Sequence, residues 1–335
     1  MVAAPVVVSN SESGPRPINL RKDVRGVLAL LNRVFRPALD ADGQRALKNL
    51  SLSNQPWFIL RLRQLADDFV PGFVWEESGQ IVGNVSLLTT DLDGRYVVAN
   101  VAVHPEYRRQ GIARTLMEMA IEKIEGRNGR EILLQVEESN APAISLYEQL
   151  GFDTIGSVTS WRSAISRMAL LPLSPEESGA DAAGAVFLRP LRRGEWAAAW
   201  RLDRASVHPD LHWPEPLPRD AYKTGFLRWL SNLLNGRRME TWVALSRRDE
   251  MVGLGTILSE WGRAHALSLR VHPAWRGRIE RVLLAKLLRR LQYLPRRNLG
   301  MDHPADDAVT TSLLREANFS ARRTLTFMKL ELSDT

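Results

Sequence analysis

The chain has 335 residues, and none of them is cysteine. This absence excludes disulfides, thiolate metal sites and a cysteine nucleophile, and it is typical of proteins in a reducing compartment. The chain also lacks any apolar run that approaches the roughly 18 residues of a membrane-spanning helix. Its first 14 residues are too short and too weakly charged for a signal peptide. We therefore expect a cytoplasmic protein with no membrane partner.

The residues that are present have the composition of a soluble globular protein, with 44 % hydrophobic and 25 % charged side chains. The length favours two ordinary domains over one large domain. Residues 171–185 are rich in proline, glycine, serine and alanine without an apolar period, which indicates a linker. The sequence leaves the oligomeric state open. It predicts a flexible tail (1–14), a first domain (15–170), this linker and a second domain (186–335).

Apolar periodicity predicts the elements that begin the first domain. Alternating apolar and polar residues indicate strands, whereas apolar residues repeated every three or four positions indicate helices. A serine-glycine pair between two alternating segments is typical of a hairpin turn. The predicted elements are a strand (16–20), a helix (23–35), a second helix (57–69) and a hairpin (73–76 and 80–89).

One stretch joins an apolar strand to an apolar helix through a glycine turn. Residues 97–103 are apolar and rich in β-branched side chains, His104 and Pro105 end them, and helical apolar spacing begins at Ile112. Gly111 at this turn lets the backbone approach a ligand, and the free amides of the first helical turn attract an anion. Taken alone, a glycine such as Gly111 at a strand-to-helix turn is more often ordinary turn chemistry than a phosphate site. The positive side chains beside it are Arg108, Arg109 and Arg114.

The surrounding residues make this pattern more specific. Arg108-x-x-Gly111-x-Ala113, which follows Val-Ala-Val-His-Pro, resembles the pyrophosphate-binding signature of the GNAT (Gcn5-related N-acetyltransferase) superfamily. A second block, residues 132–152, resembles the family's next strand, the Asn-led helix after it and the Leu-Gly-Phe that closes that helix. The two blocks stand in the family's order. The resemblance implies that the first domain uses acetyl-CoA as a co-substrate.

The resemblance also assigns expected roles to individual residues. In GNAT enzymes the strand that matches Val101 to Val103 splays from its neighbour, and its backbone pairs with the pantetheine arm and the thioester carbonyl of acetyl-CoA. The amides from Arg109 to Arg114 are then expected at the pyrophosphate, and Asn140 at the pantetheine. The residues expected to bind acetyl-CoA are Val101, Ala102, Val103, Arg108, Arg109, Gln110, Gly111, Ile112, Ala113, Arg114 and Asn140.

Tyr147 stands where the family usually has the general acid for the leaving coenzyme A thiolate. A phenol with a pKa of about 10 stays protonated at neutral pH, and it can stabilise a thiolate whose pKa is about 8 to 9. The other interpretation is a half-buried core side chain, because apolar residues flank Tyr147 on its helix. We expect the catalytic role.

The general base is less clear from the sequence. The first domain is most similar to the branch that acetylates peptide and protein N-termini, including ribosomal-protein alanine acetyltransferases, where a glutamate often stands at the place of Gln135. An amide takes no proton at neutral pH. Glu137 and Glu138 at the end of the strand are the nearest carboxylates, and we name Glu137 as the candidate. They are equally well explained as solvated charges at a strand end.

The second half contains a faint copy of the first. Leu20 recurs as Leu191, Val82 as Val252, the Val-His-Pro before the glycine turn as Val271-His-Pro273, and Phe152 as Phe319, at offsets of 171, 170, 168 and 167. Ordered matches at nearly one offset indicate a duplication. We therefore predict an α/β protein with two tandem GNAT folds, each a mixed, mostly antiparallel sheet flanked by helices.

The copy has lost the residues of the proposed chemistry. Alignment on His-Pro puts Ile279 at the place of Gly111, where its side chain would crowd the phosphate site. Alignment on Phe319 puts Leu314 at the place of Tyr147. Gly277 lies two positions early, so a shifted loop that accepts phosphate stays open as the alternative. We expect a degenerate, non-catalytic second domain.

Charge separates the two halves. Residues 186–335 hold 26 Lys and Arg against 16 Asp and Glu, whereas residues 1–185 hold 19 against 22. No recognised nucleic-acid motif accompanies this charge, so we interpret it as solvated arginine-rich surface and expect no nucleic-acid partner. His208 and His212 have the spacing of a zinc pair on a helix, but two nearby prolines predict a loop, and we expect no metal site.

These inferences lead to one expected function and one alternative. We expect an N-acetyltransferase whose first domain transfers acetyl from acetyl-CoA to a primary amine of a small molecule or peptide by direct attack. Because Gln135 stands where a glutamate is usual, the prediction that the acceptor is a peptide N-terminus is weakened. The alternative is a non-catalytic module that senses acetyl-CoA or acts as a scaffold.

Overall fold

The computed structural model describes residues 13–35, 71–173, 186–214, 216–223 and 236–332. The predicted helix 57–69, almost all of the predicted tail and most of the predicted linker lie outside these ranges. Contacts between Cα atoms divide the chain into two compact units. Unit 1 comprises Met1–Gln135, Pro142–Asp153 and Met328–Thr335, and unit 2 comprises Val136–Ala141 and Thr154–Phe327. No helix in the described ranges is long and apolar enough to span a bilayer.

The sheet of unit 1 is mixed and mostly antiparallel. Its first four strands pair antiparallel in chain order, and the fifth strand pairs parallel to the fourth. Ser78 and Gly79 both have positive φ and form the tight turn of the predicted hairpin, which is confirmed. The strands are β1 (Gly14–Pro17), β2 (Gly72–Glu77), β3 (Gln80–Thr89), β4 (Arg95–Val103) and β5 (Glu131–Glu137).

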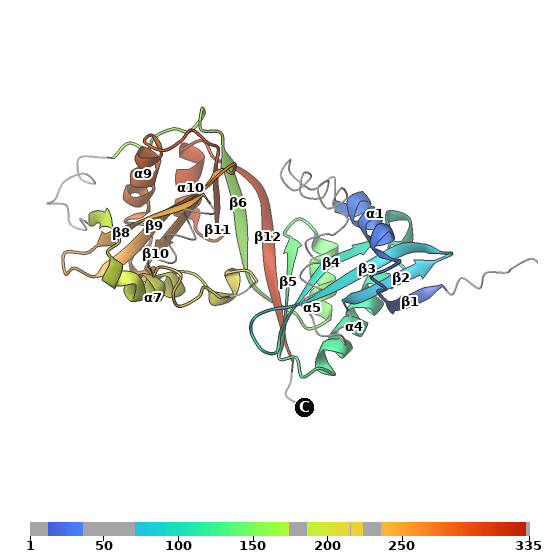
Figure 1. The fold of residues 1–335 in the computed structure, drawn as a ribbon. Helices are drawn as coiled ribbons and strands as arrows, with labels where there is room; N and C mark the ends of the chain where they lie inside the picture. The colour runs from blue at the N-terminus through green and yellow to red at the C-terminus, as the bar shows by residue number, and fades with distance from the viewer. Residues whose placement is uncertain (1–12, 36–70, 174–185, 215, 224–235, 333–335) are drawn as a thin grey trace, which may run out of the picture. The chain divides into compact units, whose positions relative to one another are not determined.

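Helices cover both faces of this sheet (Figure 1). The helix α1 (Val24–Phe35) buries Val27, Leu30 and Leu31 against one face, as its apolar periodicity predicts. The helix α4 (Ile112–Glu125) packs on the other face, directly over Gly83, where a Cβ would lie 2.7 Å from Ile112. This close approach needs a glycine in β3. A further helix in the described part of unit 1 is α5 (Ala141–Gln149).

Unit 2 repeats this arrangement of strands and helices. Its strand order is β6-β11-β10-β9-β8-β7, with α7 (Trp196–Ser206) on one face and α9 (Glu280–Leu291) and α10 (Ala308–Glu316) on the other (Figure 1). Leucines of α9 form the centre of its apolar core. The strands are β6 (Asp153–Ser163), β7 (Phe187–Pro190), β8 (Arg237–Leu245), β9 (Met251–Glu260), β10 (His265–Val271), β11 (Leu299–Pro304) and β12 (Ser320–Glu331).

Each compact unit is assembled from separate stretches of the chain, whereas each predicted domain is one continuous stretch. The strand β6 precedes the linker, yet it pairs antiparallel with β11, and its Trp161 lies in the core of unit 2. The strand β12 bonds to β6 through Ser157 and Thr326, and from Met328 onward it belongs to unit 1. A strand pairs where its hydrogen bonds and apolar contacts are satisfied, and this does not depend on its position in the sequence.

The internal repeat also exists in space. The His104 amide donates to the Val82 carbonyl at 2.8 Å, and the His272 amide donates to the Val252 carbonyl at 2.9 Å. A 3-10 turn follows each histidine, at Pro105–Tyr107 and Pro273–Trp275. Two segments about 170 residues apart therefore share one local geometry, as the offsets predict.

Candidate functional site

The strands β4 and β5 open into a fork in unit 1. Their paired residues run from Arg95 and Glu131 to Val97 and Leu133, although β4 continues to Val103. Beyond the last pair, the backbone of Val101 to Val103 has no partner on β5. Unpaired strand groups of this kind can bond an extended ligand that lies between the strands.

A β-bulge in β4 lies at the start of this fork. The register between β3 and β4 shifts between Asn84 and Ser86, and Asn100 has a φ of 54°, in the left-handed region. Asparagine tolerates this conformation better than most residues, because its short polar side chain can bond locally. The bulge changes the direction of the backbone immediately before Val101.

Three side chains hold the bulge in place. The Asn84 side-chain amide donates to the Asn100 carbonyl at 2.8 Å and to the Ser86 hydroxyl at 3.2 Å. The Asn100 side-chain amide donates to the same hydroxyl at 3.3 Å. Asn84 is completely buried, and its Oδ1 has no partner in the described part of the chain. Sequence reasoning did not identify this group, although an asparagine inside the apolar strand 81–88 was a usable signal.

The glycine turn forms a cradle of backbone amides. Gly111 has a φ of 80° and is the N-cap of α4, and a Cβ built on it would meet no atom within 4 Å. Within the described residues, the amides from Arg109 to Arg114 have no recorded acceptor. Free amides at a helix N-terminus with open space before them fit a pyrophosphate group.

Tyr147 lies on α5, which contacts α4 through a hydrogen bond from Arg114 to Gln149. Its side chain is only 5 % exposed, and its ring packs on Phe152 with 6.0 Å between the ring centroids. Burial raises the pKa of Tyr147 to about 12. The hydroxyl has no recorded partner in the described ranges. Tyr147 is therefore a core residue, as one of the two sequence interpretations has it, and its role as the general acid stays a prediction.

Unit 1 thus brings together the fork, the cradle and Tyr147. Glu137 and Asn140 lie in the segment Val136–Ala141, which belongs to unit 2. There the Asn140 amide donates to the Glu137 carbonyl at 2.8 Å, and the Glu138 amide donates to the Thr324 carbonyl at 3.0 Å. Their assigned roles stay predictions.

The second glycine turn is filled by the chain's own carboxylate. The Glu280 side chain accepts hydrogen bonds from the Gly277 amide at 2.8 Å and from the Ile279 amide at 3.1 Å, and it is 1 % exposed. Ile279 does not crowd the turn as the alignment predicts. It points into the core beside Gly253, as Ile112 does beside Gly83, so it corresponds to Ile112.

The histidine pair of unit 2 lies in a loop around the short turn Pro209–Leu211, as predicted. His208 accepts a hydrogen bond from the Asp210 amide, and His212 Nε2 lies 3.0 Å from Asp203 Oδ1. Among the described residues no three metal-ligating side chains form a cluster.

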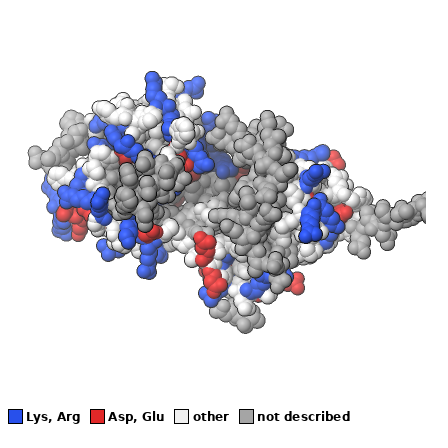
Figure 2. All heavy atoms as spheres, in the orientation of Figure 1, with Lys and Arg blue, Asp and Glu red and all other residues white. Residues whose placement is uncertain are grey.

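Lys and Arg side chains are spread over the visible face of unit 2, with Asp and Glu between them (Figure 2). Many of these arginines are in ion pairs, such as Arg290 with Glu240 and Arg281 with Glu316. Part of the positive charge is therefore paired locally, which favours the solvated-surface interpretation.

Comparisons with known proteins agree with this geometry. The model of the "Acetyltransferase (GNAT) family" matches residues 36–152. A ribosomal-protein alanine N-acetyltransferase of Escherichia coli is 50 % identical over 54 residues, which are 16 % of this chain and 36 % of that relative. An N-alpha-acetyltransferase of Sulfurisphaera tokodaii is 33 % identical over 131 residues, which are 35 % of this chain and 76 % of that relative.

Among solved structures, a tandem GNAT protein from the clavulanic acid biosynthesis pathway is similar across the whole chain. It is 18 % identical, its TM-score is 0.51, and the match covers 97 % of this chain and 99 % of the other. At this identity the likeness is one of fold. The predicted fold class, an α/β protein with two tandem folds built on mixed, mostly antiparallel sheets, is confirmed.

Proposed function

The chain belongs to the GNAT superfamily, and from this premise we propose that its first half is an acetyl-CoA-dependent N-acetyltransferase. The observation that carries the proposal is the open amide cradle at Gly111 in the same compact unit as the forked strands and Tyr147. A pyrophosphate at the cradle and an extended thioester arm along Val101 to Val103 use groups that otherwise lack partners.

The reaction is a direct attack of a neutral amine nitrogen on the thioester carbonyl carbon. The new C–N bond forms, the C–S bond breaks, and the thiolate takes a proton from the Tyr147 hydroxyl. The amine releases its proton to water or to a carboxylate, for which Glu137 is the candidate. The raised pKa of Tyr147 keeps its hydroxyl protonated at neutral pH, so that it can donate a hydrogen bond to the departing thiolate.

The acceptor is a primary amine of a small molecule or a peptide. The relatives reported above are named as an N-acetyltransferase of a ribosomal-protein alanine and as an N-alpha-acetyltransferase, and these names support an amine acceptor. Gln135 stands where that branch often has a glutamate, so the proposal extends to small-molecule amines. The remaining binding assignments, including Arg108, Gln110, Ala113 and Asn140 around acetyl-CoA, follow the family motif.

We propose one acetyl-CoA site per chain, because the second cradle is closed by Glu280. Its carboxylate already accepts from the Gly277 and Ile279 amides and repels a phosphate. The bulge is also absent from the second copy, where β9 and β10 pair in one continuous register from Leu258 to Gly253. Unit 2 is therefore proposed to be non-catalytic.

Calorimetric titration of acetyl-CoA into the intact protein and into Gly111→Glu tests the proposal. We expect one acetyl-CoA site per chain in the intact protein and none in Gly111→Glu. The introduced carboxylate should occupy the turn, as Glu280 does in the second half, and repel the pyrophosphate. Turnover with a panel of primary amines then tests the enzyme. Binding without turnover of any amine would favour the sensor, and absence of binding in both proteins would favour a scaffold.

A further inference from the structure

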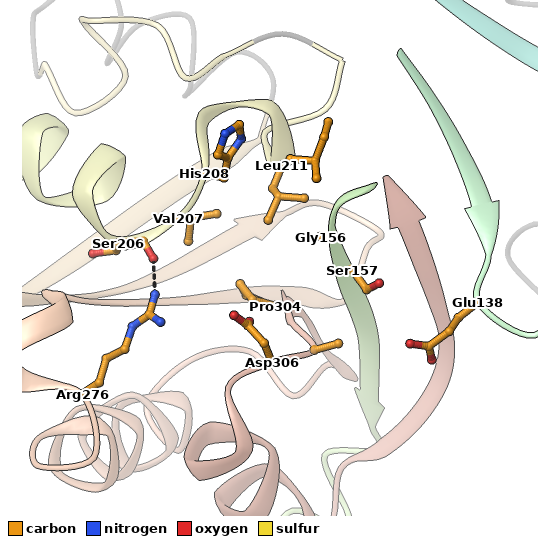
Figure 3. Close-up of a pocket in the computed structure, with 12 residues that line it drawn as sticks. Glu138, Gly156, Ser157, Ser206, Val207, His208, Leu211, Arg276, Pro304 and Asp306 are labelled. Carbon is orange, nitrogen blue, oxygen red and sulfur yellow. Dashed lines mark hydrogen bonds between the residues drawn. The ribbon is translucent and has the colours of Figure 1, made fainter. Parts of the chain in front are cut away.

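Unit 2 contains a cavity of about 420 Å³, whose walls are shown in Figure 3. The carboxylates of Glu138 and Asp306 line it together with the Arg276 guanidinium, which donates to the Ser206 carbonyl at 2.7 Å. Charges of both signs are therefore present, and they do not select a ligand of one charge. A more uniform set of charges lies on the surface of the same unit, beside two exposed aromatic rings.

These two aromatic side chains are almost completely exposed to solvent. Trp261 is 85 % exposed and Tyr293 is 78 % exposed. Trp261 lies in the tight turn between β9 and β10, which the Arg263 amide closes by donating to the Glu260 carbonyl at 3.2 Å. Gly262, with a φ of 75°, supplies the left-handed conformation of this turn. The turn itself has no need of a large ring at Trp261, so the fold does not explain an indole at this position.

The two rings lie on segments that are hydrogen-bonded to each other and to the start of β8. Three donors make these bonds: the Arg297 guanidinium to the Glu260 carbonyl, the His265 amide to the Asn298 carbonyl at 2.8 Å, and the Trp261 amide to the Gly236 carbonyl at 3.0 Å. Residues 236–240, 260–264 and 289–298 therefore form one connected surface of unit 2, which we call the basic edge.

The basic edge carries an excess of positive charge. Its three segments contain seven arginines and two acidic residues, Glu240 and Glu260, each of which is shared by two arginines. The ion pairs join Glu240 to Arg238 and Arg290, and Glu260 to Arg237 and Arg263. Arg289 and Arg296 are exposed and have no ion pair in the described part of the chain. Local pairing therefore leaves positive charge over at this edge.

The chemistry of the basic edge fits nucleic acid better than protein. Guanidinium groups bind phosphate through paired hydrogen bonds, and exposed aromatic rings stack on unpaired bases. An acidic protein segment would also meet the arginines, but a protein interface usually has an apolar core. Beside the two rings, Met239 is the only exposed large apolar side chain on the basic edge. Separate rings among excess positive charge therefore favour nucleic acid.

We propose that the basic edge binds single-stranded nucleic acid, with bases stacked on Trp261 and Tyr293 and phosphates bound by arginines that include Arg289 and Arg296. The sequence alone predicts a solvated arginine-rich surface, because it does not show that the folded chain brings these arginines beside two exposed rings. The structure supplies that placement through the hydrogen bonds between the three segments. The proposal is independent of acetyl transfer in the first half.

Fluorescence anisotropy with labelled oligonucleotides tests the proposal on the full-length protein. The probes are single strands of about 12 nucleotides, one of RNA and one of DNA, and we expect at least one to bind with a Kd of about 1 to 10 μM. Trp261→Ala should weaken this binding by about tenfold, whereas Trp261→Phe, which keeps a stacking ring, should retain most of it. Arg289→Gln combined with Arg296→Gln should reduce the slope of log Kd against log salt by about 1.

Arg247→Gln combined with Arg248→Gln is the matched control, because it removes the same charge at the opposite end of β8 and β9 and should change the affinity by less than about twofold. Thermal unfolding should verify that every variant folds. Absence of binding up to about 100 μM protein, equal affinity for a duplex, whose bases cannot stack on the rings, or unchanged affinity in Trp261→Ala would each overturn the proposal. Equally tight binding of a polyglutamate peptide would also overturn it and assign the basic edge to an acidic protein.

Discussion

The two ends of the Tyr147 side chain have different surroundings. The ring is packed against Phe152 in the core, whereas the hydroxyl has no recorded partner among the described residues. Burial destabilises the phenolate more than the phenol, which is why the pKa rises to about 12. A side chain that merely filled the core would be replaceable by phenylalanine without loss of turnover.

Tyr147→Phe should lower turnover by about 100-fold while acetyl-CoA affinity changes by less than about twofold. The substitution removes only the proton donor and keeps the ring. Steady-state kinetics and calorimetry on the same preparation measure both quantities. In the native enzyme the rate should stay level from about pH 8 to about pH 10, because an acid with a raised pKa stays protonated there and loses its proton only near pH 12. Equal turnover of both proteins would assign the general acid elsewhere.

Asn84 is predicted to act through the backbone of β4. Asn84→Leu should reduce turnover by about tenfold or more with little change in acetyl-CoA affinity, since the bulge orients the strand beside the thioester and the cradle is unaffected. Leucine stands at the corresponding place in β9, at Leu254, where the register is regular. Thermal unfolding separates this effect from loss of structure. A parallel loss of cofactor affinity would contradict the positioning role.

At the scale of elements, Asp203 connects α7 to β10 and to the loop with the histidine pair. Arg270 Nε and His212 Nε2 each lie 3.0 Å from Asp203 Oδ1, and the Tyr222 hydroxyl donates to Oδ2. Burial alone would raise the pKa of Asp203, but His212, Arg270 and Tyr222 together lower it to about 2. One carboxylate thus contacts polar groups from three segments of unit 2.

Asp203→Ala should destabilise the protein by about 3 to 5 kcal/mol, because it leaves the half-buried Arg270 and the buried Tyr222 hydroxyl without their partner. The pH dependence has a defined sign. The folded pKa lies below the usual 3.8, so the carboxylate's contribution is present above about pH 4 and is lost as the pH falls through about 2. Chemical unfolding between these values should show the loss in the native protein and a flatter profile in Asp203→Asn. The exposed Asp302→Asn should behave as the native protein does.

Glu280 is predicted to stabilise the turn before α9 as a built-in anion. Glu280→Ala should lower stability by about 1 to 3 kcal/mol, because the Gly277 and Ile279 amides lose their acceptor. Sulfate should raise the melting temperature of this variant more than chloride does at equal ionic strength, because sulfate can occupy the vacated turn. Glu280→Gln, which keeps an acceptor oxygen, should lose less. An identical sulfate response of native and variant protein would contradict the role.

At the scale of the whole molecule, the strands around the linker determine how the halves depend on each other. The strand β6 is covalently part of the first half, but its hydrogen-bond partner β11 and the apolar neighbours of Trp161 belong to unit 2. The last residues of the chain belong to unit 1, where the Leu332 amide donates to the Arg130 carbonyl at 2.8 Å. Neither half of the chain contains a complete unit.

Residues 1–173 and 186–335 expressed separately should therefore each aggregate or unfold, since β6 loses its partner and exposes Trp161. Coexpression of the two pieces should give a complex that co-purifies and unfolds cooperatively. Full-length protein cut at an inserted protease site near residue 180 is the control and should stay assembled. Two separately soluble, cooperatively unfolding halves would show that the exchanged strands are dispensable.

Local chemistry in the sequence determined much of this protein. Periodicity located β2 to β4 and the helices α1 and α4, and the family resemblance located β5 and α5. The glycine turn at Gly111 needed only the residues on either side of it. The offsets near 170 identified the duplication, because similar segments fold to similar local structure. Tertiary structure alone decided contacts between residues distant in the chain. It paired β6 with β11, turned Ile279 into the core so that Glu280 fills the second cradle, and joined Asn84 to the bulge at Asn100. Such contacts depend on register and packing between elements that are distant in the chain, and a local sequence pattern does not specify either.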